Sequence, residues 1–560
     1  MAHALAPEST QPNPGTRVSD VEHTQRLARS SAIIGLGTLL SRITGLLRVS
    51  ALAALGFAQL SDAYNIANST PNIIYELLLG GILTATLVPL FVESHERNQP
   101  DATAAINTAA FTLLAVGTVI GTLAAPWIIG IYFRLAVGPD VHGRAAQQAL
   151  ATDLLRWFMP QMLFYGITAL ASAMLNARRR FTAGAFAPVL NNIVVITMLL
   201  AVGRATTSAP TVRSVLDDPG LVTLLGLGTT AGVIAMTVVL LPAVRRAGGA
   251  IRWKWAPRHP AVRRLARLSG WTVGYVAANQ VAFFVVLVLA GSATLPGAVS
   301  IYLAAFTFFQ LPHGLLAVSV MTALGPELAS RHQAADLDGL RDHFSGGLRI
   351  LLVVMIPAAV GLAVLARPLI SALLDHGDFH ASAVTPTADT LRAFAVGLVA
   401  FSVYLYVVRT FSSMQDTRSP FMLNLVENGV NIATAFAFYE WLGIEGLAWS
   451  WTVAYFVAAV MALVRLRRRL GHLDGKMLGT TAARVVVALV PAGLAAAALD
   501  HALGSASPSR SLVTLLVAST AAGIVFVPLL QWLGIDGFGM VRQVVGRRRP
   551  EGADAGSPAR

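Results

Sequence analysis

The chain has 560 residues, of which 55% are hydrophobic and only 12% are charged, and its mean hydropathy is +0.65. A soluble domain of this size does not need so much apolar surface, so the composition excludes a soluble enzyme and predicts a polytopic membrane protein. The net charge of +13 comes mainly from arginines that cluster in loops, which indicates membrane orientation and no nucleic-acid partner. Because there is no cysteine, disulfides and thiolate metal sites are excluded.

The apolar residues come in runs that match the hydrocarbon thickness of a bilayer, so we expect an all-α fold of about fourteen transmembrane helices. The predicted helices lie at 32–57, 63–92, 105–132, 152–175, 183–203, 221–244, 268–291, 297–325, 347–373, 390–413, 420–439, 443–464, 481–502 and 511–533. Residues 1–30 are polar and rich in Pro, Ser and Thr, and they lack the apolar core of a cleaved signal. They are therefore expected to form a disordered tail.

Arginine-rich segments follow the fourth, sixth, twelfth and last of these helices, at 178–180, 245–267, 465–469 and 542–549. All four segments lie on one side of the membrane if the helix count is right. The positive-inside rule then places them, and both termini, in the cytoplasm. The sequence therefore predicts a multi-pass protein of the cytoplasmic (inner) membrane.

The chain also repeats itself. A set of residues that runs from the end of the fourth helix into the fifth recurs 240 positions later: Ser172, Met174, Arg178, Phe181 and Asn191 reappear as Ser412, Met414, Arg418, Phe421 and Asn431. Two six-helix copies that both enter from the cytoplasm form a parallel repeat, as in transporters with a central cavity. We expect a tail at 1–30, an N-lobe at 31–245, a basic linker at 246–267, a C-lobe at 268–470, helices thirteen and fourteen at 471–535 and a basic cytoplasmic tail at 536–560.

The second predicted helix carries a polar stripe. Its polar residues follow at steps of three and four, which a helix places on one face: Asp62, Asn65, Ser69, Asn72 and Glu76. A charge at the bilayer centre costs at least about 2.5–3.5 kcal/mol, so the stripe predicts a wall of a wet cavity. In the alternative interpretation, Asp62 and Asn65 lie at the headgroup level, where polar groups cost little, and Asn72 and Glu76 only bond to a neighbouring helix. Pro71 and the Gly80–Gly81 pair predict a bend.

Arg42 and Arg48 lie inside the first apolar segment. A guanidinium stays charged and donates two parallel hydrogen bonds, which suits a phosphate or diphosphate. Two arginines facing the stripe predict a cavity for an anionic headgroup. An ion pair of Arg48 with Asp62, or of Arg42 with Glu76, is the structural alternative.

The corresponding region of the C-lobe is polar and mostly uncharged. Gln310 and His313 flank Pro312, Arg409 lies near the end of the tenth helix, and Glu427 lies on the eleventh with Asn428 and Asn431 at helical spacing. We expect Asn191 and Asn192 to join helices. The predicted cavity residues are Arg42, Arg48, Asp62, Asn65, Asn72, Glu76, Gln310, Arg409 and Glu427.

Catalytic signatures are missing from the sequence. It has no phosphate-binding G-x-x-x-x-G-K-[ST], no H-E-x-x-H and no G-x-S-x-G. We therefore expect no enzyme and no cofactor, and a driving force from an ion gradient, the membrane potential or the substrate's own gradient. A coupling cation stays open. His376, Asp378 and His380 could bind a metal, but without a further ligand nearby an ordinary solvated turn is the better explanation.

Several stretches resemble the MurJ (MviN) family of lipid II flippases, in the multidrug/oligosaccharidyl-lipid/polysaccharide exporter superfamily. They are LSRITGLLR at 40–48, SDAYNIANSTPN at 61–72, VPLFVE at 88–93, LNARRRFTAGAFAPVLNN at 175–192, LPHGLLAVSV at 311–320, HGDF at 376–379 and QDTRSP at 415–420. The Arg- and Ala-rich composition suggests an actinobacterial member. The resemblance implies a two-lobed, V-shaped transporter that translocates lipid II from the inner to the outer leaflet by alternating access.

Within this resemblance, Arg42, Arg48 and Asp62 match charged positions of the family, and the arginines would hold the diphosphate. The last two helices would form a groove for the polyprenyl tail. Two regions depart from the family pattern: Tyr75, Glu76 and Gly80 replace charged residues in helix two, and Thr307 and Gln310 replace an arginine and a glutamate in helix eight.

The partners implied are a polyprenyl-diphosphate-linked glycopeptide, membrane lipids and cell-wall synthesis or division proteins. The alternatives are an exporter of another polyprenyl-linked glycan or of a drug, and a non-transporting scaffold for cell-wall enzymes.

Overall fold

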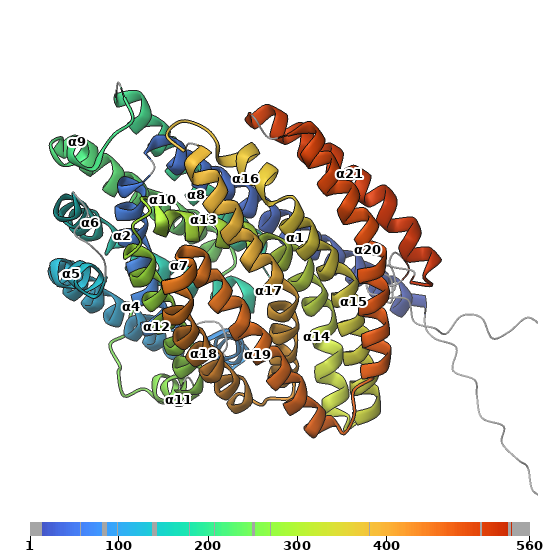
Figure 1. The fold of residues 1–560 in the computed structure, drawn as a ribbon. Coiled ribbons are helices and arrows are strands. Elements are labelled where there is room, and N and C mark those ends of the chain that lie inside the picture. The colour runs from blue at the N-terminus through green and yellow to red at the C-terminus, as the bar shows by residue number, and fades with distance from the viewer. Residues whose placement is uncertain are drawn as a thin grey trace, which may run out of the picture.

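The structure is a computed structural model that describes residues 14–56, 58–80, 87–97, 99–136, 143–178, 180–206, 208–248, 252–268, 270–379, 381–504, 507–535 and 539. Within these residues the regular structure is entirely helical (Figure 1). The predicted all-α membrane fold is therefore confirmed.

The N-lobe contains helices α1 to α10. Their bounds are α1 Pro14–Leu55, α2 Gln59–Tyr75, the π-helical turn η1 Glu76–Gly80, α3 Val88–Glu96, α4 Pro100–Leu123, α5 Ala125–Leu135, α6 Arg144–Phe158, α7 Gln161–Ala177, α8 Thr182–Ala205, α9 Val212–Leu216 and α10 Pro219–Arg246. Helix α8 packs between α1 and α10, and α2 packs on α6.

The linker, the C-lobe and the last helices follow along the chain. Their bounds are α11 Pro260–Leu268, α12 Gly270–Gly291, α13 Ala298–Pro312, the π-helical turn η3 His313–Ala317, α14 Val318–Gln333, α15 Leu337–Val364, α16 Ala366–Leu374, α17 Ala381–Ser413, α18 Arg418–Leu442, α19 Ile444–Leu470, α20 Gly475–Leu503 and α21 Pro508–Trp532. Helix α19 packs between α17 and α18.

Each predicted membrane segment corresponds to a helix or to a run of consecutive helices. In the described part of the chain, twelve segments are long and apolar enough to cross a membrane. The two predicted segments beyond these are the run from α2 to α3 and the helix α18, whose polar residues lower its hydropathy. A short apolar helix, α5, continues the third predicted segment beyond Leu123.

The predicted bend in helix two falls at an irregular turn. Pro71 lies inside α2, and the π-helical turn η1 follows at Glu76–Gly80. In the second half of the chain, Pro312 ends α13 and the π-helical turn η3 follows at once. A proline removes one intrahelical hydrogen bond, and π-helical turns are common where such a ladder is disturbed. The repeat therefore extends to the second helix of each lobe.

An aromatic cluster forms the centre of the C-lobe. Phe306, Phe309, Phe394, Phe401 and Trp451 contact one another with ring centroids 4.6–6.1 Å apart. Each such pair contributes about 0.5–1.5 kcal/mol beyond the apolar area that it buries. The cluster therefore fixes α13, α17 and α19 relative to one another.

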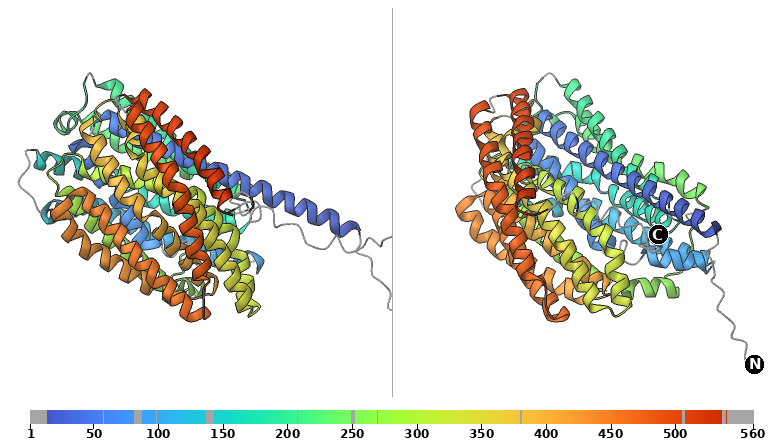
Figure 2. Two further views of the ribbon diagram at one scale, coloured as in Figure 1. Left: turned by 45° about the vertical axis from the view of Figure 1, so that its right-hand side comes forward. Right: turned by 90° about the vertical axis from the view of Figure 1, so that its right-hand side faces the viewer.

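The two lobes meet along α2 and α1. Helices α12 and α13 of the C-lobe contact α2, and α13 and α16 contact α1. Helices α20 and α21 pack on each other, and their main further contacts are with α15 and α16 (Figure 2). This pair is thus attached to the C-lobe.

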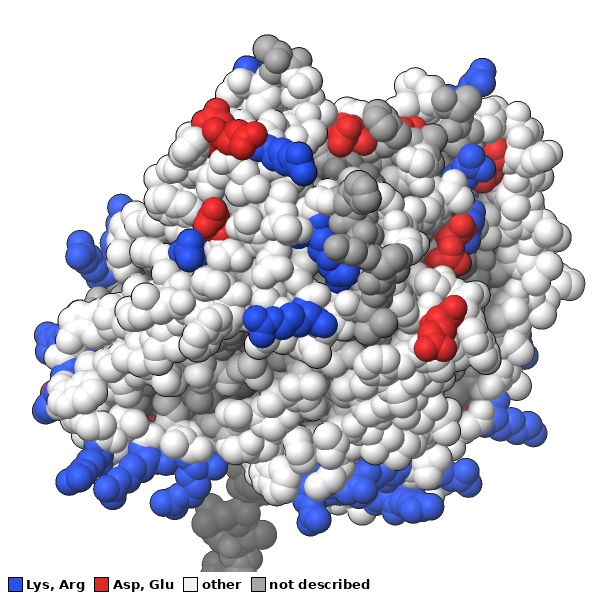
Figure 3. Space-filling view, turned by 60° about the vertical axis from the view of Figure 1, so that its left-hand side comes forward, with Lys and Arg blue, Asp and Glu red and all other residues white. Residues whose placement is uncertain are grey.

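Basic side chains gather at one end of the bundle. Figure 3 shows Lys and Arg along one edge of the molecule. Exposed arginines follow α10, fill the linker and end α19, among them Arg246, Arg258 and Arg467. We call this the arginine-rich end, and the end where α1 stops and α2 starts the arginine-poor end.

The beginning of the chain differs from the predicted disordered tail. Helix α1 begins at Pro14, so residues 14–30 are helical and project past the other helices (Figure 2). Residues 16–30 contain no Pro and no Gly, which allows the first membrane helix to continue without a break. Residues 1–13, and nearly all of the predicted tail at 536–560, lie outside the described residues.

Candidate functional site

A cavity of about 370 Å³ lies between α1, α2 and α13. Helix α1 contributes Arg42 and Arg48, and α2 contributes Asn65. The first half of the chain therefore supplies the charge, and α13 of the C-lobe supplies the facing wall. Further polar and aromatic lining residues are Asn68, Ser69, Asn192, Ser300, Thr307 and Phe379.

The two arginines are half-buried in this wall, six residues apart on one helix. In the described part of the chain neither forms an ion pair, so the alternative pairs with Asp62 and Glu76 are not present in this structure. A methyl group on Gly314 of η3 would lie 3.0 Å from a guanidinium nitrogen of Arg42. The Arg42 head thus crosses to the C-lobe and rests against a glycine.

Asp62 lies beside this cavity and not in its wall. Its side chain is 6% exposed, and Oδ1 accepts hydrogen bonds from the Ser300 amide at 2.8 Å and from the Ser300 hydroxyl at 2.7 Å. Asn65 Nδ2 donates to the same hydroxyl at 2.9 Å. Ser300 is in the first turn of α13, where free amides and the helix dipole favour a negative charge. Asp62 therefore joins the two lobes at the arginine-poor end.

Glu427 occupies a second cavity of about 150 Å³, inside the C-lobe. Its side chain is 1% exposed, and Oε2 has no hydrogen-bond partner among the described residues. Asn279 Oδ1 accepts from Asn424 at 2.9 Å and from Asn428 at 3.0 Å, which holds α12 against α18. The structure therefore does not bring Glu427 together with the two arginines, although Phe306 lines both cavities.

The remaining predicted residues lie outside the walls of both cavities. Asn72 is exposed, while Glu76, on η1, and Gln310 are half-buried. Arg409 is exposed and, like Arg42, interacts electrostatically with the buried His313.

Several wall residues were absent from the predicted set. Ser300, Thr307 and Phe379 lie far from α1 and α2 in the sequence. The family resemblance includes Thr307 and Phe379 without assigning either to the cavity, and nothing in its residue type marks Ser300. Asn192, predicted to join helices, does so: its Nδ2 donates to Ser41 O at 3.2 Å and to Thr44 Oγ1 at 3.0 Å. It also lines the cavity. Of the three residues considered for a metal, His380 lies outside the described residues.

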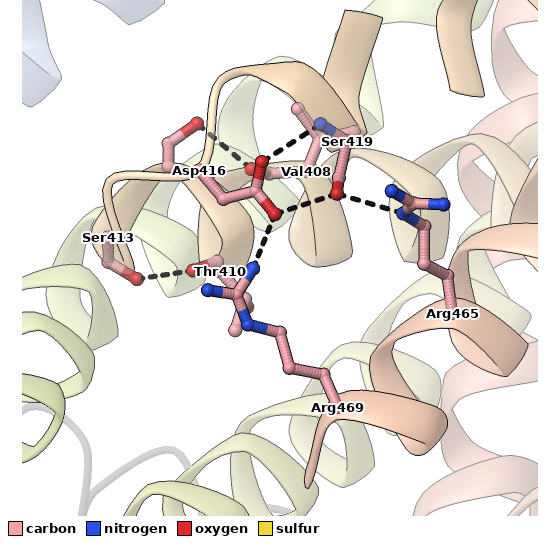
Figure 4. A network of polar contacts seen from close by, with 8 residues as sticks. Val408, Thr410, Ser413, Asp416, Ser419, Arg465 and Arg469 are labelled. Carbon is pink, nitrogen blue, oxygen red and sulfur yellow. Dashed lines mark hydrogen bonds and ion pairs between the residues drawn. The ribbon is translucent and has the colours of Figure 1, made fainter. Parts of the chain in front are cut away.

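A polar network closes the turn between α17 and α18 at the arginine-rich end (Figure 4). Asp416 accepts from the Ser419 amide at 3.0 Å and hydroxyl at 2.7 Å, and it pairs with Arg469. Arg465 Nε donates to the Ser419 hydroxyl at 2.8 Å. Partial burial raises the pKa of Asp416, but the Ser419 hydrogen bonds and the Arg469 charge outweigh it, so the net pKa is lowered. The QDTRSP stretch thus ties α18 to the end of α19.

Curated relatives match most of the chain. A probable lipid II flippase MurJ of Rhizobium tropici is 28% identical over 537 residues, covering 94% of this chain and 97% of the relative. A lipid II flippase MurJ of Burkholderia cenocepacia is 30% identical over 445 residues, covering 77% of this chain and 82% of the relative.

Solved structures show the same fold. The chain aligns with a lipid II flippase MurJ in an inward closed conformation, with a TM-score of 0.71 and 20% identity over 90% of this chain and all of that one. An inward-facing multidrug resistance MATE family transporter of the MOP superfamily aligns with a TM-score of 0.63 and 13% identity, over 77% of this chain and 94% of that one. The family model described as lipid II flippase MurJ matches residues 52–517. The chain therefore belongs to the lipid II flippase MurJ family.

Proposed function

We propose that this protein translocates lipid II from the inner to the outer leaflet of the cytoplasmic membrane. The observation that carries the proposal is the pair Arg42 and Arg48, which line a cavity between the lobes and form no ion pair in the described part of the chain. A guanidinium held in a membrane protein without a carboxylate is set up for an anionic ligand. The diphosphate of lipid II has the matching charge and geometry.

The size of the cavity limits what it holds in this arrangement. Drug-sized ligands occupy pockets of about 300–1,000 Å³, and the cavity measures about 370 Å³. A lipid-linked disaccharide peptide is larger than this. We therefore propose that the cavity takes the diphosphate and the adjoining sugar, and that the lobes separate to admit the rest.

Alternating access would need the lobe contacts to break at one end at a time. Asp62 and Asn65 bind Ser300 at the arginine-poor end, 2.7–2.9 Å away. We propose that this end faces outward and that the arginine-rich end and both termini face the cytoplasm, because cytoplasmic loops carry the excess of Arg and Lys. The Asp62 contact would then close the outer side while lipid II enters from the inner leaflet.

The chain has no sequence signature of nucleotide hydrolysis, so we propose a transporter driven by an existing gradient or by the membrane potential. Cell-wall synthesis enzymes that supply or consume lipid II are the proposed partners. The identity of a coupling cation does not enter this proposal.

The test uses bacteria in which this protein is the sole lipid II flippase. An added enzyme that cleaves lipid II only at the outer face reports translocation. Wild type should yield cleavage product, Arg48→Ala should abolish it while still inserting, and Arg48→Lys should restore only part of it, since a lysine keeps the charge but not the fork.

The matched control is Arg213→Ala, because Arg213 is exposed on α9 and away from the cavity walls. It should yield product as wild type does. Normal cleavage with Arg48→Ala would overturn the role of this arginine. A wild type that inserts well and yields no product would overturn the flippase proposal in favour of another polyprenyl glycan or a scaffold.

A further inference from the structure

The loop at 375–379, between α16 and α17 of the C-lobe, lies on the end of α1 in the N-lobe. The Asp378 amide donates a hydrogen bond to Ala54 O at 3.1 Å. One turn earlier on α1, the Ser50 hydroxyl donates to Leu373 O, in the last turn of α16, at 2.7 Å. Two hydrogen bonds to backbone carbonyls therefore hold the last turn of α1 against the C-lobe.

Gly377 is required by this contact for two separate reasons. Its φ is +61°, in the left-handed region that glycine adopts without strain. A Cβ atom at this position would lie 2.2 Å from Ala54 O and 2.9 Å from Ala54 C, far inside van der Waals contact with backbone that cannot rotate away. Any other residue must therefore move the loop off α1.

The same loop also forms part of the cavity wall. Phe379 follows Asp378 directly, is 1% exposed, and lines the cavity that contains Arg42 and Arg48. Six residues separate Ala54 from Arg48, about 9 Å along a helix. A movement of the loop away from α1 therefore changes the wall near the arginines as well as the lobe contact.

We propose that the 375–379 loop is a latch that holds the arginine-poor end closed, and that Gly377 is the residue that lets it engage. For this end to open, the Asp378 amide must leave Ala54 and Gly377 must separate from the α1 backbone. Only the effect of the latch on transport rests on the proposed function. The closure itself rests on the contacts above.

The experiment measures the width of the arginine-poor end directly. The sequence has no cysteine, so Arg213→Cys on α9 and His501→Cys on α20 introduce two unique labelling sites without further changes. Both side chains are exposed, one on each lobe's side of the molecule. Spin labels on the full chain in lipid nanodiscs, without lipid II, give the distance distribution by pulsed electron resonance.

We expect Gly377→Ala to shift this distribution towards long distances and to raise the ratio of open to closed protein at least about tenfold, which corresponds to about 1.4 kcal/mol. The matched control is Gly443→Ala. Gly443 also has a positive φ, +57°, but a Cβ there meets nothing within 4 Å. This control shares the backbone strain without the lobe clash, so it should leave the distribution as in wild type. An unchanged distribution in Gly377→Ala would overturn the latch.

A second variant covers the case in which Gly377→Ala does not insert. In this variant Ala54→Cys and Asp378→Cys are joined by a short thiol cross-linker, and positions 213 and 501 carry spin labels attached by a chemistry that does not use thiols. The cross-link should confine the distance between the two labels to its short value. A distribution as broad as that of the unlinked protein would equally overturn the latch.

The same cross-link separates the two proposals in cells. It should stop outer-face cleavage of lipid II, and cleaving the linker should restore it. If the linked protein stays closed but the unlinked protein yields no cleavage product, the latch stands and the flippase proposal fails.

Discussion

Asp62 on α2 accepts hydrogen bonds from both the amide and the hydroxyl of Ser300, at 2.8 and 2.7 Å, and so caps the first turn of α13 from the opposite lobe. The contact joins residues 238 positions apart. It combines a charge-assisted hydrogen bond with a favourable helix-dipole interaction, so its strength depends on the negative charge as well as on shape.

The first prediction concerns this charge. Asp62→Asn keeps an acceptor for Ser300 but removes the charge from the α13 terminus, and we expect a loss of about 0.3–1 kcal/mol of stability, up to about 2 because the site is buried. Thermal unfolding in detergent measures it. Asn72→Ala, at an exposed position on the same helix, is the control and should stay within about 0.5 kcal/mol of wild type. Equal melting temperatures for wild type and Asp62→Asn would contradict the capping role.

The second prediction concerns the place where Arg42 rests. A Cβ on Gly314 would lie 3.0 Å from a guanidinium nitrogen of Arg42, so Gly314→Leu fills the space that the guanidinium occupies and should displace Arg42 from the cavity. We expect outer-face cleavage of lipid II to fall at least about tenfold, since misplacing a binding group by about 1 Å can cost 100-fold. Gly325→Leu is the matched control, because a Cβ on Gly325 meets nothing within 4 Å. If both leucine variants transport lipid II as well as wild type does, the space beside Gly314 is not needed to hold Arg42 in the cavity.

The third prediction concerns the buried Glu427. Its Oε2 has no partner in the described part of the chain, and the neighbouring acceptor Asn424 Oδ1 also lacks a donor. Gln has nearly the shape of Glu, carries no charge and supplies a donor, so Glu427→Gln should unfold at the same temperature as wild type or higher. The exposed Glu440→Gln should change nothing. A clear loss of stability in Glu427→Gln alone would mean that a group from outside the chain holds the carboxylate.

The fourth prediction concerns pH and the network around Asp416. The folded-state pKa of Asp416 is lowered, so its charge contributes stability above the unfolded pKa, and this contribution is lost as the pH falls through the folded pKa. Asp416→Asn should therefore destabilise the protein at pH 7, by at most about 1 kcal/mol because Arg469 is partly exposed. Near pH 2 the difference from wild type should disappear.

Thermal unfolding of wild type and Asp416→Asn across this pH range measures the effect. The control is Asp338→Asn, because Asp338 pairs with Arg341 from a position with 88% side-chain exposure. A destabilisation by Asp416→Asn that is the same at both pH values would show that shape, and not charge, accounts for it.

Much of the fold could be predicted because a bilayer fixes the length of an apolar run. All the predicted segments have a helical counterpart, and the irregular turn after Pro71 falls where the Pro and Gly positions placed it. Residues 14–30 were mistaken for a disordered tail because composition describes solubility, whereas a helix continues from a neighbouring stable helix at little further cost.

The candidate site could be predicted only in part. Helical spacing correctly placed Asp62 and Asn65 on one face of α2, but it does not say what lies opposite that face. Asp62 meets the first turn of α13, whereas Asn65 also reaches the cavity. The spacing likewise grouped Glu427 with Asn428 correctly, yet it could not show that a separate cavity encloses them. Partners from distant segments, such as Ser300, carry no signal in a single sequence.

Phe306 lines both the cavity that holds Arg42 and Arg48 and the C-lobe cavity that holds Glu427. This half-buried ring therefore lies between a cavity lined by two arginines and a cavity lined by a glutamate. A change in the orientation of the Phe306 ring would therefore alter the walls of both cavities at once.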